Sequence, residues 1–104
     1  MKKDKIKVII KEVDKAPRTA VINNCLANLQ AKVAGYIETV TDYKVEGGIL
    51  IVNDEGAING MRPNAKIDGL TLFGTIIFAG QEGEEFTDYP VSLAEMKKLR
   101  PELF

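Results

Sequence analysis

Two adjacent carboxylates, Asp54 and Glu55, at the end of an apolar run, are residues whose types could do chemistry. Paired acidic groups serve as general acid and base when their surroundings push their pKa values apart. Neighbouring residues on a strand or turn point apart, however, and the chain has no histidine to complete such a pair. With Asp68 they offer oxygen ligands to a hard cation, but their spacing fits no recognised calcium loop. We therefore expect a turn here, and we expect no catalytic residue, metal site or cofactor.

The segment Gly60-Met61-Arg62-Pro63-Asn64 offers hydrogen-bond donors instead. If its glycine and proline hold an exposed loop, Arg62 and Asn64 can present N–H groups to a carboxylate, a phosphate or the backbone of a partner. The alternative is that Asn64 folds its amide onto its own backbone as an Asx turn. The predicted binding residues are Asn53, Asp54, Glu55, Arg62 and Asn64.

Four lysines, Lys3, Lys5, Lys7 and Lys11, form a basic stripe along one predicted strand. Such a stripe is typical of a solvated face or of an edge protected against aggregation. Binding of nucleic acid through this stripe is an alternative, but no aromatic residue alternates with the lysines to stack on bases. The formal net charge of −1 gives no electrostatic reason for a polyanionic partner either. We therefore expect no nucleic-acid partner.

Cys25 is the only cysteine, which excludes an internal disulfide. It stands near a predicted helix N-terminus, where the helix dipole lowers the pKa of a thiol. Without a histidine partner, we expect a buried or half-buried cysteine with no reactive role. The longest uncharged apolar run, 70–80, is much shorter than the roughly 20 residues that cross a bilayer. These features predict a cytoplasmic protein that does not enter a membrane.

The elements that must position these residues follow from hydrophobic periodicity. With 104 residues, of which 45% are hydrophobic, the chain can fill the core of one domain spanning 1–104. Strands are predicted at 5–13, 18–22, 36–41, 49–52 and 70–79, with helices at 25–34 and after Ser92. This order, β-β-α-β-β-β-α, indicates an α+β fold: a mostly antiparallel sheet of four to five strands, a central amphipathic helix and a short C-terminal helix. The segment 57–68 is expected to be irregular.

Local residue types predict where both helices begin and end. Asn23 or Asn24 is expected to cap the first helix, and Gly35 to adopt the left-handed conformation that ends it. The second helix has signals at both ends: a capping box of Ser92 and Glu95, a hydrophobic staple of Val91 and Met96, and Pro101 as its stop.

The predicted strands at 49–52 and 70–79 are apolar on both faces, so we expect them to be interior strands of one sheet. Gly74, inside the second of them, indicates a bulge or a close approach. One helix covers one face, and the last helix, a second protomer or both must cover the other. This reasoning predicts a possible homodimer.

Short motifs across the chain resemble the domain-of-unknown-function family numbered 3846. They are Leu29-Gln30, Gly35-Tyr36-Ile37-Glu38, Asn53-Asp54-Glu55-Gly56, Gly60, Pro63-Asn64, Gly74-Thr75, Glu85-Phe86 and Leu93. The family often has a basic residue directly after the asparagine that matches Asn64, whereas here Ala65 follows. The resemblance implies a fold and an origin in bacteria, phages or mobile elements, but no reaction.

These observations lead to three hypotheses about function. The first is a non-enzymatic protein-interaction or accessory module that acts through a sheet edge or the 60–64 loop. The second is a small enzyme or ligand-binding protein that uses Asp54, Glu55 and Arg62. The third is weak nucleic-acid binding through the lysine stripe.

Overall fold

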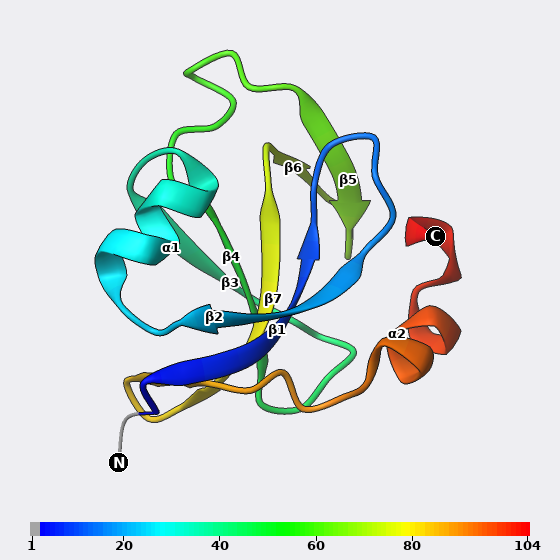
Figure 1. Cartoon of the computed structure of the whole chain (residues 1–104). Helices are drawn as coiled ribbons and strands as arrows, with labels where there is room; N and C mark the ends of the chain where they lie inside the picture. Colours follow the sequence, from blue (N-terminus) through cyan, green and yellow to red (C-terminus); the bar gives the residue numbers. More distant parts are fainter. Residues whose placement is uncertain (1–2) are drawn as a thin grey trace.

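The computed structural model describes residues 3–104, whose strands form one antiparallel sheet with a separate small hairpin beside it (Figure 1). In chain order the elements are β1 Lys5–Lys11, β2 Arg18–Asn23, α1 Leu26–Val33, β3 Ile37–Thr41, β4 Gly48–Asn53, β5 Pro63–Ile67, β6 Leu70–Phe73, β7 Ile76–Glu82, β8 Glu85–Thr87, α2 Leu93–Leu99 and a 3₁₀ turn, Pro101–Leu103. The sheet order is β2-β1-β7-β4-β3, with β8 also pairing β7. The predicted α+β class is confirmed.

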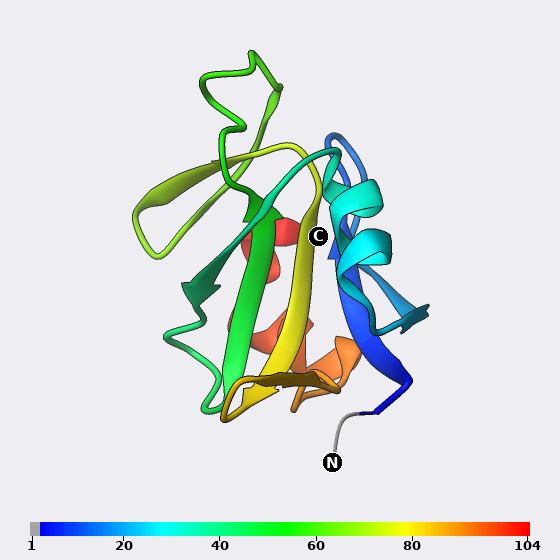
Figure 2. The same cartoon turned by 90° about the vertical axis from the view of Figure 1, so that its left-hand side faces the viewer.

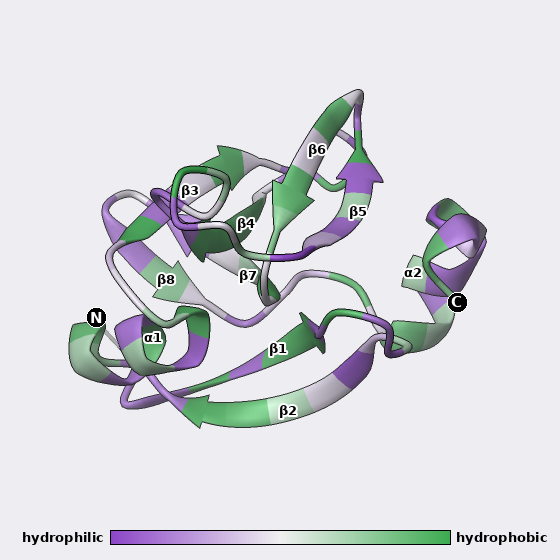
Figure 3. Ribbon diagram, turned by 90° about the horizontal axis from the view of Figure 1, so that it is seen from above, coloured by the Kyte–Doolittle hydropathy of each residue, from purple (hydrophilic) through white to green (hydrophobic). Residues whose placement is uncertain are grey.

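The two central strands, β4 and β7, are buried on both faces because a layer of the same chain covers each side. On one face Ile49, Ile51 and Ile77 pack with Leu29 and Val33 of α1. On the other face the buried cluster is formed by Ile9, Val45, Leu50, Val52, Ile67, Leu72, Ile76, Phe78, Tyr89, Met96 and Leu103. Seen from above, α1 lies on one side of the sheet, and α2 with the β5–β6 hairpin lies on the other (Figure 3). Burial of these strands therefore gives no reason to invoke a second protomer.

The strand predicted at 70–79 is in fact two strands, and the break falls at Gly74. This glycine has φ +74°, and a Cβ placed on it would stand 2.9 Å from the sulfur of Met61. The close approach was predicted, but the turn that sends β6 out of the main sheet was not. Asp68 and Gly69, with φ +52° and +84°, form the two-residue hairpin turn that pairs β6 with β5. Only 57–62 is irregular, so the prediction for 57–68 was wrong over Pro63–Ile67.

The ends of α1 differ from the sequence prediction. Cys25 occupies the N-cap position without a side-chain hydrogen bond, while the amide of Asn24 donates to the carbonyls of Lys3 and Phe86. The left-handed residue at the C-terminus is Ala34, with φ +62° and ψ +42°, and not Gly35. Gly35 is needed for a different reason: a Cβ there would stand 2.6 Å from Nδ2 of Asn53.

The left-handed Ala34 leads to a prediction about stability. Its methyl group is strained in this conformation, whereas glycine adopts it freely. Ala34→Gly should therefore raise the free energy of unfolding by about 0.5–1 kcal/mol, measured by urea denaturation. Ala31→Gly, an exposed position inside the same helix, is the matched control and should lower it by about 1 kcal/mol. A loss of stability in both variants would contradict the assigned end of the helix.

The second helix begins at the predicted cap, Ser92, but only half of the capping box forms, because the Glu95 carboxylate contacts the Ser92 hydroxyl and not its backbone N–H. The Ser92 hydroxyl accepts a hydrogen bond from the Glu95 backbone N–H at 3.1 Å, and Met96 is fully buried. Val91 and Met96 pack in the same core cluster, as the staple requires. The α-helix ends at Leu99, and Pro101 opens the short 3₁₀ turn that follows. Within residues 3–104, no helix has the length and apolar character needed to cross a membrane.

Candidate functional site

Asn53, at the end of β4, is a buried support for the end of α1. Its Nδ2 donates to the carbonyls of Val33 and Ala34, at 3.0 and 3.1 Å. Its Oδ1 accepts the backbone N–H of Glu55 at 2.8 Å. These contacts satisfy carbonyls that a helix C-terminus leaves without partners. The side chain is therefore fully used within the chain, although sequence reasoning placed it among the binding residues.

Asp54 and Glu55 are exposed beside a shallow hollow of about 240 Å³, where the loop between β4 and β5 leaves the sheet. The hollow is lined by Gly35, Tyr36, Asn53, Asp54, Glu55 and Asn59. The backbone N–H of Asp54 donates to the Tyr36 carbonyl at 2.8 Å, which joins the start of β3 to the end of β4. Figure 2 shows this loop projecting beyond the end of the sheet.

Two large apolar side chains are exposed in this same region. Tyr36 is 73% exposed, and Ile58, next to Asn59 in the loop, is 83% exposed. We call Tyr36, Asp54, Glu55, Ile58 and Asn59 the Tyr36 surface. Two of the motifs that carry the family resemblance, the one containing Tyr36 and the one containing Asp54 and Glu55, contribute to it.

Arg62 does not line that hollow. Its guanidinium pairs with the Asp14 carboxylate at 2.5 Å, and both side chains are largely exposed. An exposed pair of this kind contributes little to stability. The structure therefore brings Asp54 and Glu55 to one place and leaves Arg62 with a different partner.

Asn64 links three segments of the chain from a half-buried position. Its Nδ2 donates to the carbonyls of Lys11 and Gly74, both at 2.7 Å, and its Oδ1 accepts from Nζ of Lys11 at 3.0 Å. These partners lie far from Asn64 in sequence, so the contacts are not those of an Asx turn. The amide holds the β5–β6 hairpin against the end of β1.

Asn64→Ala should lower the free energy of unfolding by about 1–2 kcal/mol, because it leaves two carbonyls and a buried ammonium with fewer partners. Urea denaturation monitored by circular dichroism measures this change. Arg62→Ala, two residues earlier and exposed, is the matched control and should change stability by less than about 0.5 kcal/mol. Equal effects from the two variants would contradict the bridging role of Asn64.

The lysine stripe is not a uniform solvated face. Lys5 and Lys7 are exposed, Lys3 pairs with Asp88 at 2.6 Å, and Lys11 is buried. Burial lowers the pKa of Lys11 from its ordinary value, and Asp14 nearby opposes that shift. Cys25 is also not where it was expected: its side chain is exposed and forms no disulfide.

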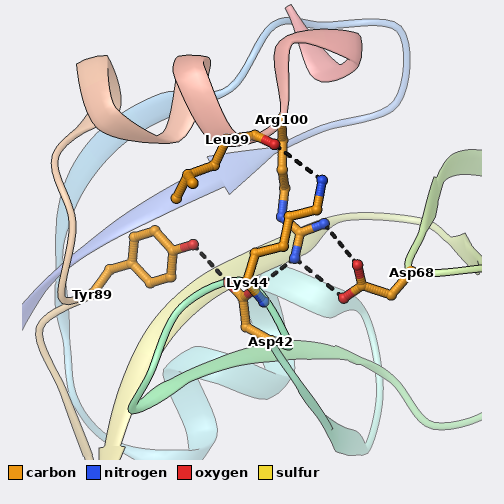
Figure 4. Close-up of polar contacts among 6 residues, drawn as sticks. All are labelled: Asp42, Lys44, Asp68, Tyr89, Leu99 and Arg100. Atoms are coloured by element: carbon orange, nitrogen blue, oxygen red, sulfur yellow. Dashed lines mark hydrogen bonds and ion pairs between the residues drawn. The ribbon is translucent and has the colours of Figure 1, made fainter.

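A largely buried polar cluster surrounds Arg100 and was not foreseen from the sequence (Figure 4). Its guanidinium donates to Asp42 at 2.5 Å and makes two contacts of 3.2 Å with Asp68. The Tyr89 hydroxyl donates to the other oxygen of Asp42 at 2.6 Å. The cluster connects the β3–β4 loop, the β5–β6 turn, the irregular segment between β8 and α2, and the end of α2.

The centre of the Arg100 cluster is closed to solvent, and only Asp68, at its edge, is partly exposed. The Arg100 and Asp42 side chains are 1% and 0% exposed, so no substrate reaches their charged atoms. Burial, with the hydrogen bond to Asp42, raises the pKa of the Tyr89 hydroxyl far above its ordinary value. The hydrogen bond from Arg100 lowers the pKa of Asp68. No sequence signal joins positions 42, 68, 89 and 100, because each contact depends on the tertiary fold.

These features define an α+β domain whose sheet is covered on both faces and which buries the ion pair of Arg100 with Asp42. The model of the domain-of-unknown-function family DUF3846 matches residues 6–100, and the chain belongs to this family. Neither the curated proteins nor the solved structures with which the chain was compared gave a match. Among the described residues, no group of three or more histidine, cysteine, aspartate or glutamate side chains is placed to hold a metal ion.

Proposed function

We propose that this chain is a non-enzymatic protein-binding module that contacts its partner through the Tyr36 surface. The observation that carries this proposal is the pair of exposed apolar side chains, Tyr36 and Ile58, beside a hollow lined by Asp54 and Glu55. Tyrosine is enriched among the residues that dominate binding energy, because it buries a large rigid ring and keeps a polar tip.

The chemistry of the surface indicates the kind of partner. Asp54 and Glu55 provide negative charge at the rim, and no ion pair engages either carboxylate among residues 3–104. A partner segment with lysine or arginine next to large apolar side chains would complement both features. The surface is held in place by Asn53 and by the bond between Asp54 and Tyr36, so little ordering cost accompanies binding.

The alternative of a small enzyme has less support. It needs Asp54, Glu55 and Arg62 around one site, whereas Arg62 is paired with Asp14 and does not line the hollow beside Asp54 and Glu55. The proposed setting is the cytoplasm, consistent with one free cysteine, in a bacterium, phage or mobile element, as the family resemblance implies.

A displayed library of random peptides tests the proposal. We expect enrichment of peptides that combine lysine or arginine with large apolar residues. Tyr36→Ala/Ile58→Ser should weaken the binding of enriched peptides by about tenfold or more. Tyr43→Ala, at a tyrosine that is 78% exposed elsewhere, is the matched control and should bind as the original chain does. If no peptide is enriched, or if the enriched peptides bind the double variant unchanged, the proposal is wrong.

A further inference from the structure

The strand β2 leaves one edge of the sheet open within the described part of the chain. It pairs with β1 in continuous register, from Lys5 opposite Asn23 to Ile10 opposite Arg18, and with no other strand (Figure 3). An edge of this kind presents backbone N–H and C=O groups to a further strand, although at its end the Asn23 carbonyl already accepts a hydrogen bond from Nδ2 of Asn28 at 2.8 Å. Natural edges are usually blocked by charged side chains, proline or a bulge; β2 has one charged residue, Arg18 at its first position, and the following Thr19-Ala20-Val21-Ile22-Asn23 contains none of these.

A hollow of about 540 Å³ lies on one face of β1 and β2. Its floor includes Lys7 and Thr19, and its far wall is the segment from Asp88 to Ala94 that leads into α2. Thr19 and Val21 project to the same face because side chains alternate along a strand. Val21 is 66% exposed. A strand added beside β2 would therefore direct every second side chain toward this groove.

The face that such a strand would meet carries free positive charge. Lys5 and Lys7 are exposed and stand opposite Asn23 and Val21 in the register. A second hollow of about 330 Å³, at the other end of β2, is lined by Lys5 and by Lys32 of α1. None of these three lysines forms an ion pair within residues 3–104.

The one carboxylate in the groove is already engaged inside the chain. Asp88 accepts hydrogen bonds from Nζ of Lys3 at 2.6 Å and from the backbone N–H of Lys7 at 2.8 Å. The hydrogen bond from Lys3, with that from Lys7, lowers the pKa of Asp88, so this carboxylate stays ionised and occupied at neutral pH. It therefore leaves Lys5, Lys7 and Lys32 available to a ligand.

We propose that β2 binds an extended, acidic segment of another polypeptide as an added strand, with alternate aspartate or glutamate side chains on the same face of the sheet as Lys5 and Lys7, whose long side chains reach toward them across β2. Backbone hydrogen bonds along β2 would provide affinity, and the lysines would select the acidic sequence. This site consists of different residues from the Tyr36 surface, so a result that contradicts one proposal leaves the other unaffected.

Two displayed peptide libraries test the proposal, one with glutamate or aspartate at alternate positions and one with lysine there. Peptides of about eight residues are long enough to span β2. We expect enrichment from the acidic library alone, and an enriched peptide should protect backbone amides of β2 from hydrogen exchange. Lys5→Glu/Lys7→Glu should weaken its binding at least tenfold and should turn the preference toward the lysine library.

The matched control is Lys66→Glu/Lys98→Glu, which makes the same change of charge at exposed lysines outside the groove. It should bind the acidic peptides with less than a threefold change. Tyr36→Ala/Ile58→Ser should also bind them normally, which separates this test from the test of the Tyr36 surface. Absence of enrichment, or binding that leaves β2 amides unprotected, would refute the proposal. Protection of β2 that rises with protein concentration alone would replace it with pairing between two copies of this chain.

Discussion

Replacing Arg100 with methionine is expected to lower the free energy of unfolding by about 3–5 kcal/mol, the largest effect of any single substitution considered for this protein. The guanidinium is the only cation that contacts Asp42 among residues 3–104, and Asp42 is fully buried. Without it, the Asp42 carboxylate would keep its hydrogen bonds from Tyr89 and the Lys44 backbone but would have no compensating charge. Urea denaturation of the variant measures the loss.

A second variant keeps this prediction testable if the first does not fold. Tyr89→Phe removes one hydrogen bond of 2.6 Å from the same carboxylate and should cost about 1–2 kcal/mol. In Arg100→Met/Asp42→Leu, removal of both buried charges should recover much of the stability lost in Arg100→Met, because an apolar pair has no desolvation penalty. An additive loss in the double variant would show that the charges are not coupled.

The dependence of the free energy of unfolding on pH in the acid range tests the same cluster independently. Arg100 lowers the pKa of Asp68 in the folded state below the value of about 3.9 expected in the unfolded chain. The stability contributed by this group is therefore present above about pH 4 and is lost as the pH falls through the folded pKa. Arg100→Met should show a shallower loss in acid. The pKa of Asp88 is also lowered, but by Lys3 and Lys7, so Asp88 should contribute equally to the loss of stability in acid in both proteins.

Gly80→Ala is expected to produce the second largest loss, about 2–3 kcal/mol. Gly80 lies in β7, and a Cβ there would stand 2.3 Å from the Asp88 carbonyl oxygen and 2.5 Å from the Thr87 hydroxyl. The carbonyl belongs to backbone and cannot rotate away. The strand must shift, and the hydrogen bond from the Tyr89 N–H to the Lys7 carbonyl, at 2.9 Å, would lengthen with it.

Gly60→Ala separates this steric effect from the general cost of losing a glycine. A Cβ on Gly60 would meet nothing within 4 Å, but the residue has φ +73°. Its substitution should cost about 1 kcal/mol from backbone strain alone. Thermal and urea denaturation of both variants should rank Gly80→Ala as clearly less stable. The reverse order would mean that β7 and the segment after β8 are not packed as described.

The candidate site was foreseen only in part. Asp54 and Glu55 were predicted at a strand end and lie exposed there, because turn residues next to an apolar strand are a local signal. Asn53 and Asn64 were predicted as binding residues, Asn64 for its donors, but both bind backbone groups of distant segments. Which polar side chain remains free for a ligand depends on which carbonyls lie nearby in the folded chain, and residue type alone does not determine that.

The sequence by itself determined the features that depend on neighbours along the chain. The capping of α2 by Ser92 follows from a contact three residues apart, and the two-sided burial of β4 follows from an uninterrupted apolar run. Tertiary structure decided the rest: the break at Gly74 against Met61, and the ion pairs that bring Asp42, Asp68 and Arg100 together. The physical reason is how far apart in sequence the contacting residues lie. Hydrophobic periodicity and helix capping depend on residues that are close in sequence, whereas close packing and the pairing of buried charges exist only once distant segments meet.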